Sequence, residues 1–90
     1  MNERTEAVDY LFDAILSLKS KEECYHFFED LCTVKELQSM AQRMEVARML
    51  KEKKTYAEIA GKTGASTVTI SRVNRILSQG TGSLNRLIDK

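Results

Sequence analysis

The chain has 90 residues and contains no proline, no tryptophan and no low-complexity tract, which indicates one small domain. No apolar run approaches the roughly 20 residues that a bilayer-spanning helix needs. Residues 1–6 carry acidic and polar groups rather than the basic and then apolar start of a signal peptide. These features argue against a membrane protein and predict a cytoplasmic location.

The net charge of +1 is distributed unevenly along the chain. Residues 1–41 hold 4 basic and 9 acidic groups, a net charge of −5, whereas residues 42–90 hold 10 basic and 4 acidic groups, a net charge of +6. A basic surface binds polyanions by releasing their counterions, and an acidic surface is repelled by the same phosphates. The segregation predicts that the C-terminal half meets nucleic acid while the N-terminal half points away from it. Ordinary solvated charge is the alternative reading.

The first half of the chain reads as three helices. Apolar residues at three-and-four spacing predict an amphipathic helix from Thr5 to about Leu18. A second, short helix carries an apolar stripe of Cys24, Phe27, Phe28 and Leu31. Helix starts are indicated where a hydroxyl is followed three residues later by glutamate, at Ser20, Thr33 and Thr55.

The third helix, from about Val34 to Lys51, has the widest apolar face. That face consists of Leu37, Met40, Ala41, Met44, Val46, Ala47, Met49 and Leu50. It is broader than one neighbouring helix could cover, so this helix is expected to be central. The width also predicts that the first three helices pack against a second copy in a homodimer, because small cores are marginal alone. A monomer whose helices cover one another is the alternative.

The second half continues with helices only. A fourth helix is expected over Tyr56 to Lys62 and a fifth from Thr67 to about Ser78, ending near Gly80. Ser83 is expected to cap a short last helix that contains Leu84, Leu87 and Ile88. The fold class is therefore all-α with six helices.

The fourth and fifth helices have the pattern of a helix-turn-helix. Such a pair needs apolar groups where its helices meet, a small residue at their closest approach and a glycine able to take a positive φ in the turn. Ala60 is the small residue and Gly64 occupies the turn. The inward positions are Ile59, Thr63, Ala65, Ile70 and Val73. A packed helical hairpin without DNA-binding function is the alternative.

If those residues face inward, the outward face of the fifth helix is small, polar and basic. Short hydroxyl and methyl groups can approach base edges, and arginine can bind guanine or phosphate, so this face suits the DNA major groove. The predicted DNA-binding residues are Lys53, Lys54, Tyr56, Ser66, Thr67, Val68, Thr69, Ser71, Arg72 and Arg75. These lysines, together with Lys51 and Lys62, suit phosphate contacts, whereas Thr67, Thr69, Ser71 and Arg72 are expected to select sequence.

Residues 33–77, "TVKELQSMAQRMEVARMLKEKKTYAEIAGKTGASTVTISRVNRIL", resemble the tryptophan repressor superfamily and, within it, the small TrpR-like YerC/YecD group. The resemblance implies an intertwined homodimer that binds a palindromic operator in double-stranded DNA and acts as a transcriptional repressor. It implies that residues 1–51 and 81–90 form the dimerisation core and that residues 55–78 form the DNA-binding head. In helix-turn-helix proteins of this kind, the second helix of each head lies in the major groove.

The resemblance also implies an effector site, because two arginines of the family's pattern that hold a small-molecule corepressor fall on Arg43 and Arg72. Val73 and Ile76 stand where that pattern has a glycine and a serine. These changes fill the pocket and remove a polar anchor, so tryptophan is not the expected ligand. Another small effector, or none, is left open.

Other classes of function find little support in the sequence. His26 is the single histidine and is expected to be a partly buried packing residue, and no glycine-rich phosphate loop is present, so an enzyme is not expected. Cys24 and Cys32 would lie about 12 Å apart on a helix, too far for a disulfide, and are expected to be buried free thiols without a metal. A helical adaptor that binds proteins is the alternative to a DNA-binding regulator.

Overall fold

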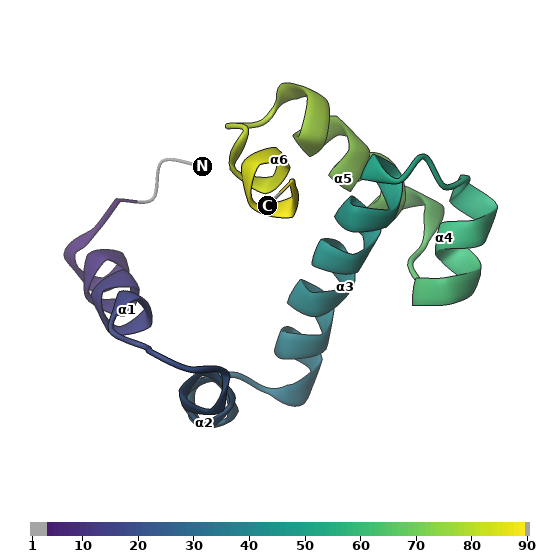
Figure 1. Cartoon of the computed structure of the whole chain (residues 1–90). Coiled ribbons are helices and arrows are strands. Elements are labelled where there is room, and N and C mark those ends of the chain that lie inside the picture. The colour runs from purple at the N-terminus through teal and green to yellow at the C-terminus, as the bar shows by residue number, and fades with distance from the viewer. Residues whose placement is uncertain (1–3, 90) are drawn as a thin grey trace. The chain divides into compact units, whose positions relative to one another are not determined.

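The computed structural model describes residues 4–89, and every regular element in that range is an α-helix (Figure 1). The helices are α1 (Glu6–Leu16), α2 (Lys21–Leu31), α3 (Val34–Lys51), α4 (Tyr56–Thr63), α5 (Thr67–Gln79) and α6 (Ser83–Ile88). The all-α, six-helix prediction is confirmed. The chain divides into two compact units, Met1–Val34 and Lys35–Lys90. None of the helices in the described range is both long and apolar enough to cross a membrane.

Side-chain caps start α2 and α4 where the sequence pattern indicated. The amide of Glu58 donates to the Thr55 hydroxyl at 3.1 Å while the amide of Thr55 donates to the Glu58 carboxylate at 2.9 Å, which is a complete capping box. At α2 the amide of Glu23 donates to the Ser20 hydroxyl at 3.1 Å. The Glu23 carboxylate accepts instead from the amide of Lys19, one residue before the cap, at 3.0 Å.

The end of the first helix differs from the sequence prediction. The first helix ends at Leu16 rather than Leu18, because the Ser17 hydroxyl turns back and donates to the carbonyl of Ala14 at 2.7 Å. Such side-chain bonds compete with the helix ladder. The expected end of the fifth helix is met within one residue, since α5 runs to Gln79.

The predicted cap at Ser83 is wrong. Gly82 is the N-cap residue of α6, with φ of 90°, and no side chain caps this helix. Ser83 is the first helical residue, and its amide donates to the hydroxyl of Thr81 at 3.3 Å. A left-handed residue at position 82 turns the chain into the helix, and glycine adopts that conformation without a Cβ penalty.

Within residues 4–34, neither α1 nor α2 contains a buried residue. Large apolar side chains of this unit are exposed, namely Tyr10, Phe12, Leu16, Tyr25, Leu31 and Val34. Phe27 and Phe28 pack edge to face with ring centroids 5.1 Å apart. The apolar stripes predicted for these helices are therefore present but largely uncovered in a single copy of the unit.

Three side chains of this unit were expected to be more buried than they are. Cys24 and Cys32 are free thiols, as predicted, but both are only half-buried. His26 has a side chain that is 69% exposed and lies 3.4 Å from the carboxylate of Glu22. The prediction failed because it assumed covered stripes on α2, and no helix of this unit covers them completely.

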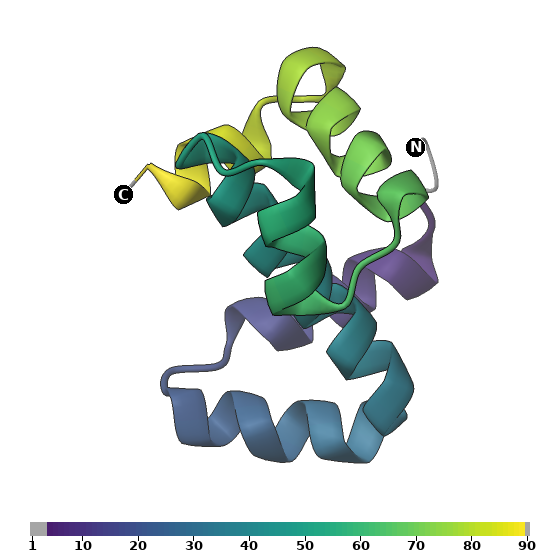
Figure 2. The same ribbon diagram turned by 90° about the vertical axis from the view of Figure 1, so that its right-hand side faces the viewer.

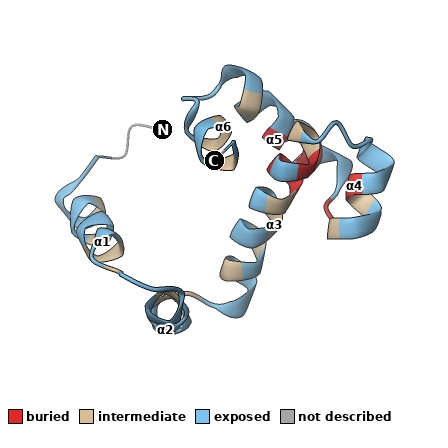
Figure 3. Cartoon of the chain, in the orientation of Figure 1, coloured by how far each residue is buried: buried red, intermediate tan, exposed pale blue. Residues whose placement is uncertain are grey.

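Residues 35–89 have their own hydrophobic core where the C-terminal half of α3 meets α4 and α5 (Figures 2 and 3). Its buried members are Val46, Ala47, Met49, Ile59, Ala65, Ile70 and Val73. Leu84 and Ile88 pack α6 against this core. The inward positions predicted for the helix-turn-helix are thus confirmed, with Thr63 half-buried among them.

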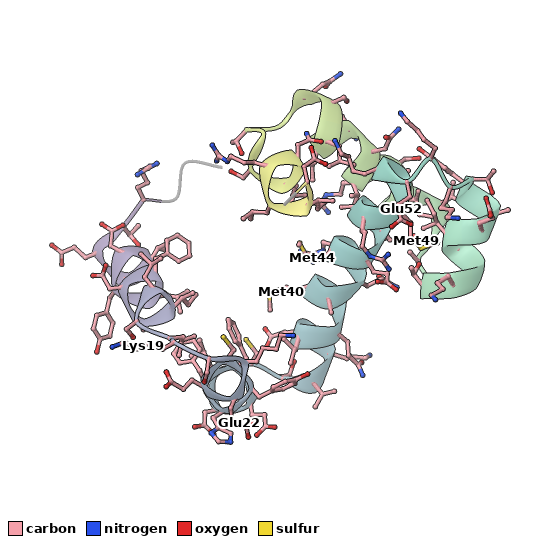
Figure 4. The ribbon with its side chains drawn as sticks, viewed as in Figure 1. Lys19, Glu22, Met40, Met44, Met49 and Glu52 are labelled. Atoms are coloured by element: carbon pink, nitrogen blue, oxygen red, sulfur yellow. The ribbon has the colours of Figure 1, made fainter. Side chains whose placement is uncertain are left out.

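The wide apolar face predicted for α3 is only half covered. Val46, Ala47 and Met49 belong to the core, whereas Met40 and Met44 are 39% and 44% exposed. Figure 4 shows Met40 and Met44 projecting from one side of α3 and Met49 from the other. The part of the face nearer the N-terminus of α3 is left open within this unit.

Candidate nucleic-acid interface

The turn between α4 and α5 has the geometry that the sequence predicted. Gly64 has φ of 74°, and its amide donates to the carbonyl of Ala60 at 2.9 Å. The side-chain amide of Gln42 on α3 donates to the carbonyl of Thr63 at 3.1 Å, in a part-buried position. This bond fixes the turn to α3, so the head formed by residues 55–78 rests on a rigid helix.

Ser66 and Thr69 serve the start of α5. The amide of Thr69 donates to the Ser66 hydroxyl at 3.1 Å, and that hydroxyl lies 3.2 Å from the hydroxyl of Thr69, to which it donates. Ser66 is exposed and Thr69 half-buried. Because both hydroxyls are engaged in the cap, they are less available to bases than the other predicted contact residues.

The remaining predicted residues of α5 form an exposed face. These residues are Thr67, Val68, Ser71, Arg72 and Arg75. Val68 is 77% exposed, the largest apolar exposure on this helix. In residues 4–89 no carboxylate lies within ion-pair distance of Arg72 or Arg75. The two guanidinium groups are therefore available to an external anion.

Arg48 on α3, in contrast to Arg72 and Arg75, is paired with carboxylates. Its guanidinium group donates to Glu45 at 2.8 Å and to Glu52 at 3.0 Å. The hydrogen bond from Arg48 holds the pKa of the Glu45 carboxyl below its ordinary value. The positive charge of Arg48 is balanced locally, so this arginine is poorly suited to bind phosphate. Its glutamates lie at helical i,i+3 and i,i+4 spacing, whereas Arg72 has no acidic residue three or four positions away.

Of the predicted lysines, Lys53 and Lys54 lie in the loop between α3 and α4, and both are exposed. The amide of Lys54 donates to the carbonyl of Met49 at 3.1 Å, and the amide of Lys53 donates to that of Leu50 at 3.0 Å. This pair of bonds is a Schellman motif, which places Lys53 in the left-handed region with φ of 65°. Glycine usually occupies that position, because other residues are strained there by about 1–2 kcal/mol.

The predicted effector residues, Arg43 and Arg72, lie on α3 and α5. Arg43 is exposed, and its guanidinium group donates to the hydroxyl of Ser39 on the same helix at 3.1 Å. Val73 is 2% exposed and belongs to the core. Ile76 is exposed on α5. Since the Val73 side chain is packed among core residues, it occupies space that a residue without a side chain would leave open.

Sequence reasoning missed Asn74, whose side-chain amide donates to the hydroxyl of Tyr56 at 3.3 Å. This bond links the first turn of α4 to the middle of α5. Asn74 lies three residues after Ser71 and seven after Thr67, so helical spacing places it on the same edge of α5. That spacing was the signal that could have identified it.

Sequence reasoning also missed a polar network that holds the C-terminal end of α5. The side-chain amide of Asn85 donates to the carbonyl of Leu77 at 2.6 Å, and Lys51 donates to the Asn85 side-chain oxygen at 3.0 Å. The ammonium group of Lys51 also lies 3.3 Å from the Asp89 carboxylate. Lys51 is therefore a structural residue that joins α3 to α6. No local sequence pattern indicates such a long-range network.

The described residues contain no group of three or more histidine, cysteine or acidic side chains that could hold a metal ion. The hydrogen bonds of the capping box, led by the one from the Thr55 amide, hold the pKa of the Glu58 carboxyl below its ordinary value. The carboxylate thus occupies the start of α4, and the amide donors there are partly used within the protein. The chemistry of this surface is that of hydroxyl and cationic groups for noncovalent binding.

Comparison with known proteins gives consistent matches along nearly the whole chain. Residues 6–90 match the family model of the Trp repressor protein. The chain is 56% identical over 87 residues to the uncharacterized protein YerC of Bacillus subtilis (strain 168), covering 97% of this chain and 84% of YerC. The predicted resemblance is confirmed.

Solved structures agree on the fold. A TrpR-like protein from Eubacterium eligens superposes with a TM-score of 0.93 at 57% identity, covering 96% of this chain and 89% of that one. The crystal structure of a candidate Trp repressor from Staphylococcus aureus gives a TM-score of 0.92 at 55% identity, covering 96% and 86% of the two chains. With six helices arranged in this fold and a family match over residues 6–90, the chain belongs to the Trp repressor family.

Proposed function

We propose that the protein is a homodimeric, sequence-specific DNA-binding regulator that represses transcription by occluding its operator. The observation that carries the proposal is the exposed face of α5, on which Arg72 and Arg75 stand among short side chains without a neighbouring carboxylate in residues 4–89. A surface that must enter a charged groove needs cations and small groups rather than large apolar ones. Membership of the Trp repressor family supports the same function.

The proposed DNA-binding residues fall into two groups with different roles. Thr67, Ser71 and Arg72 are proposed to read base edges, and Arg75 lies about one turn further along the same helix. Lys53 and Lys54 are proposed to bind phosphates from the loop before α4, and they would position the head rather than select a sequence. Ser66 and Thr69 contribute mainly by capping α5.

The homodimer is proposed from the apolar surface that a single copy leaves open. Met40 and Met44 on α3 are exposed, as are six large apolar side chains of residues 4–34. We assign residues 1–51 and 81–90 to the dimerisation core and residues 55–78 to the DNA-binding head. Two-fold symmetry would present two copies of α5 to major grooves one helical turn apart, about 34–36 Å, which requires a palindromic operator.

We propose that tryptophan is not required for DNA binding. Arg43 has a hydrogen-bond partner on its own helix, and Val73 is buried in the core. An aromatic ligand between Arg43 and Arg72 would have to share space with the side chains of Val73 and Ile76. The regulator would then act without an effector or with a small molecule other than tryptophan.

Selection of bound sequences from random duplexes tests the proposal. At a stated salt concentration, the protein is expected to enrich one palindromic sequence and to bind it at least about 10³-fold more tightly than competitor DNA. Arg72→Ala is expected to weaken binding of that duplex by about 5- to 150-fold and to relax the choice at one base position. Added free tryptophan should leave the affinity unchanged.

Arg48→Ala is the matched control, because it removes the same charge from an arginine already paired with Glu45 and Glu52. It should leave the selected sequence unaltered. Binding of all duplexes with equal affinity would contradict sequence-specific regulation.

Lys53→Gly is expected to raise stability and to lower DNA affinity in the same protein. Glycine relieves the left-handed strain at this position and should stabilise the fold by about 0.5–1 kcal/mol. Loss of the ammonium group removes one phosphate contact, so the affinity for all duplexes should fall alike. The slope of the logarithm of the binding constant against the logarithm of the salt concentration should decrease in magnitude by about 1. Thermal denaturation and binding titrations at several salt concentrations measure the two effects.

Lys53→Ala is the control for the strain, because alanine keeps the Cβ and the left-handed conformation. It should lower DNA affinity equally without the gain in stability. A loss confined to one sequence would show that Lys53 reads bases rather than a phosphate.

A helical adaptor is the second candidate function, favoured by the exposed apolar side chains of residues 4–34. An adaptor would use that surface for another protein and would need no basic face on α5. A species of twice the chain mass in sedimentation, together with selective DNA binding, supports the regulator. A single-chain species without duplex selectivity supports the adaptor.

A further inference from the structure

We propose that Lys53, Tyr56 and Asn74 together form a subsite for one phosphate group of the DNA backbone, at the edge of α5 that faces the start of α4. The inference deepens the proposed function and rests on it. It adds Asn74 to the binding surface and gives Tyr56 a defined chemical role. Three observations carry it: a groove, a pair of coupled hydrogen-bond donors and a cation without a local partner.

The groove lies between the C-terminal end of α3 and the second half of α5. Its volume is about 290 Å³. It is lined by Leu50, Lys51, Lys53, Asn74, Leu77 and Ser78. Tyr56 does not line the groove itself and is joined to it by the hydrogen bond from Asn74.

Tyr56 and Asn74 supply two neutral donors. The Asn74 side-chain amide donates one hydrogen to the Tyr56 oxygen at 3.3 Å and keeps a second hydrogen for another acceptor. A phenol oxygen that accepts a bond still carries its own hydrogen, and acceptance strengthens that hydrogen as a donor. Both side chains are exposed, so both remaining hydrogens can reach an external oxygen.

Only one of the two groove lysines is available for an anion. The ammonium group of Lys51 is bound by Asn85 and lies beside the Asp89 carboxylate. No carboxylate in the described part of the chain pairs with Lys53. The Ser78 hydroxyl donates to the backbone carbonyl of Arg75 at 3.2 Å and so offers no hydrogen to a ligand. The site therefore presents one positive charge and two directed donors, which matches a phosphate oxyanion.

The position of Asn74 favours the DNA backbone as the source of the phosphate. Asn74 lies on the edge of α5 that also carries Thr67 and Ser71, the proposed base-reading residues. A DNA strand whose bases meet that face would carry its backbone past this edge. A free phosphate ion would find the same donors, so the two sources have to be separated by experiment.

The experiment uses the full chain and its selected duplex, with one backbone phosphate at a time replaced by a neutral methylphosphonate in each half-site. For the wild-type protein, one position is expected to weaken binding by about tenfold. Tyr56→Phe and Asn74→Ala should each weaken binding of the unmodified duplex by about tenfold, the lower end for a single hydrogen bond to a charged group. Each variant should lose less affinity than the wild type at that position, because one of the donors is already missing while the Lys53 contact remains.

Ser78→Ala is the matched control, because it removes a hydroxyl from the same groove that is already bonded to the helix backbone. Its affinity and its methylphosphonate profile should equal those of the wild type. The double variant with Tyr56→Phe and Asn74→Ala should lose less than the product of the single losses, since the two side chains act as one unit. Thermal melts of each variant show that the fold is retained.

Failure of the wild-type protein to prefer any duplex overturns the proposed function itself. If the wild type is selective but the variants keep its full methylphosphonate profile, the phosphate subsite is refuted while the regulator stands. In a separate experiment, inorganic phosphate is titrated into the protein–DNA complex, and chloride at equal ionic strength is the reference. Displacement of DNA from the wild type but not from Tyr56→Phe would identify a free anion as the occupant and overturn the assignment to the backbone.

Discussion

Replacing Met44 by glutamate is expected to convert a dimer into a single chain of 10.3 kDa. Met44 is 44% exposed on the open side of α3, outside the core of its own unit. In a two-fold interface each copy contributes the substitution, so two carboxylates would be buried without partners. At several kcal/mol per ion, the dissociation constant should rise at least about a thousandfold. Sedimentation at micromolar concentration measures the change.

Gln38→Glu is the matched control for this substitution. It places the same charge on an exposed position of α3 that does not belong to the apolar face. Its sedimentation should equal that of the wild type at twice the chain mass. A Met44→Glu variant that still sediments as the wild type would remove α3 from the interface, and a wild type that sediments as one chain would remove the dimer.

The head could be predicted from the sequence because its determinants are local. Ala60 and Gly64 are separated by one helical turn, and the glycine must take a positive φ whatever the rest of the chain does. Ile59 and Ile70 lie on opposite sides of that turn at spacings that bring them together. The exposure of Arg72 and Arg75 then follows from helical geometry alone.

The predictions that failed depended on contacts that sequence spacing does not define. His26 and the two cysteines were expected to be buried because α2 has an apolar stripe, but a stripe says nothing about what covers it. The bond from Asn85 to Leu77 joins residues from different helices, and neither shows a pattern along the chain. The pairs of Arg48 with its glutamates, by contrast, follow helical spacing. The sequence could therefore have separated Arg48 from Arg72, which has no acidic residue three or four positions away.

Ile70→Ala is expected to destabilise the protein by about 2–5 kcal/mol. Ile70 is fully buried, at 0% exposure, where α5 packs against α4 and α3. The substitution removes apolar contacts and leaves a cavity that neighbouring side chains fill only in part. Urea denaturation measures the loss, at a fixed protein concentration because self-association couples stability to concentration.

Val68→Ala on the same helix is the control, since its side chain is 77% exposed and contributes little burial. Its stability should stay within about 0.5 kcal/mol of the wild type, because exposed substitutions rarely change more. The difference between the two variants separates the packing of α5 against α3 and α4 from the intrinsic helix propensity of α5. Equal losses at both positions would mean that α5 is held mainly by surfaces other than this core, and the rigid presentation of Arg72 and Arg75 would then need another explanation.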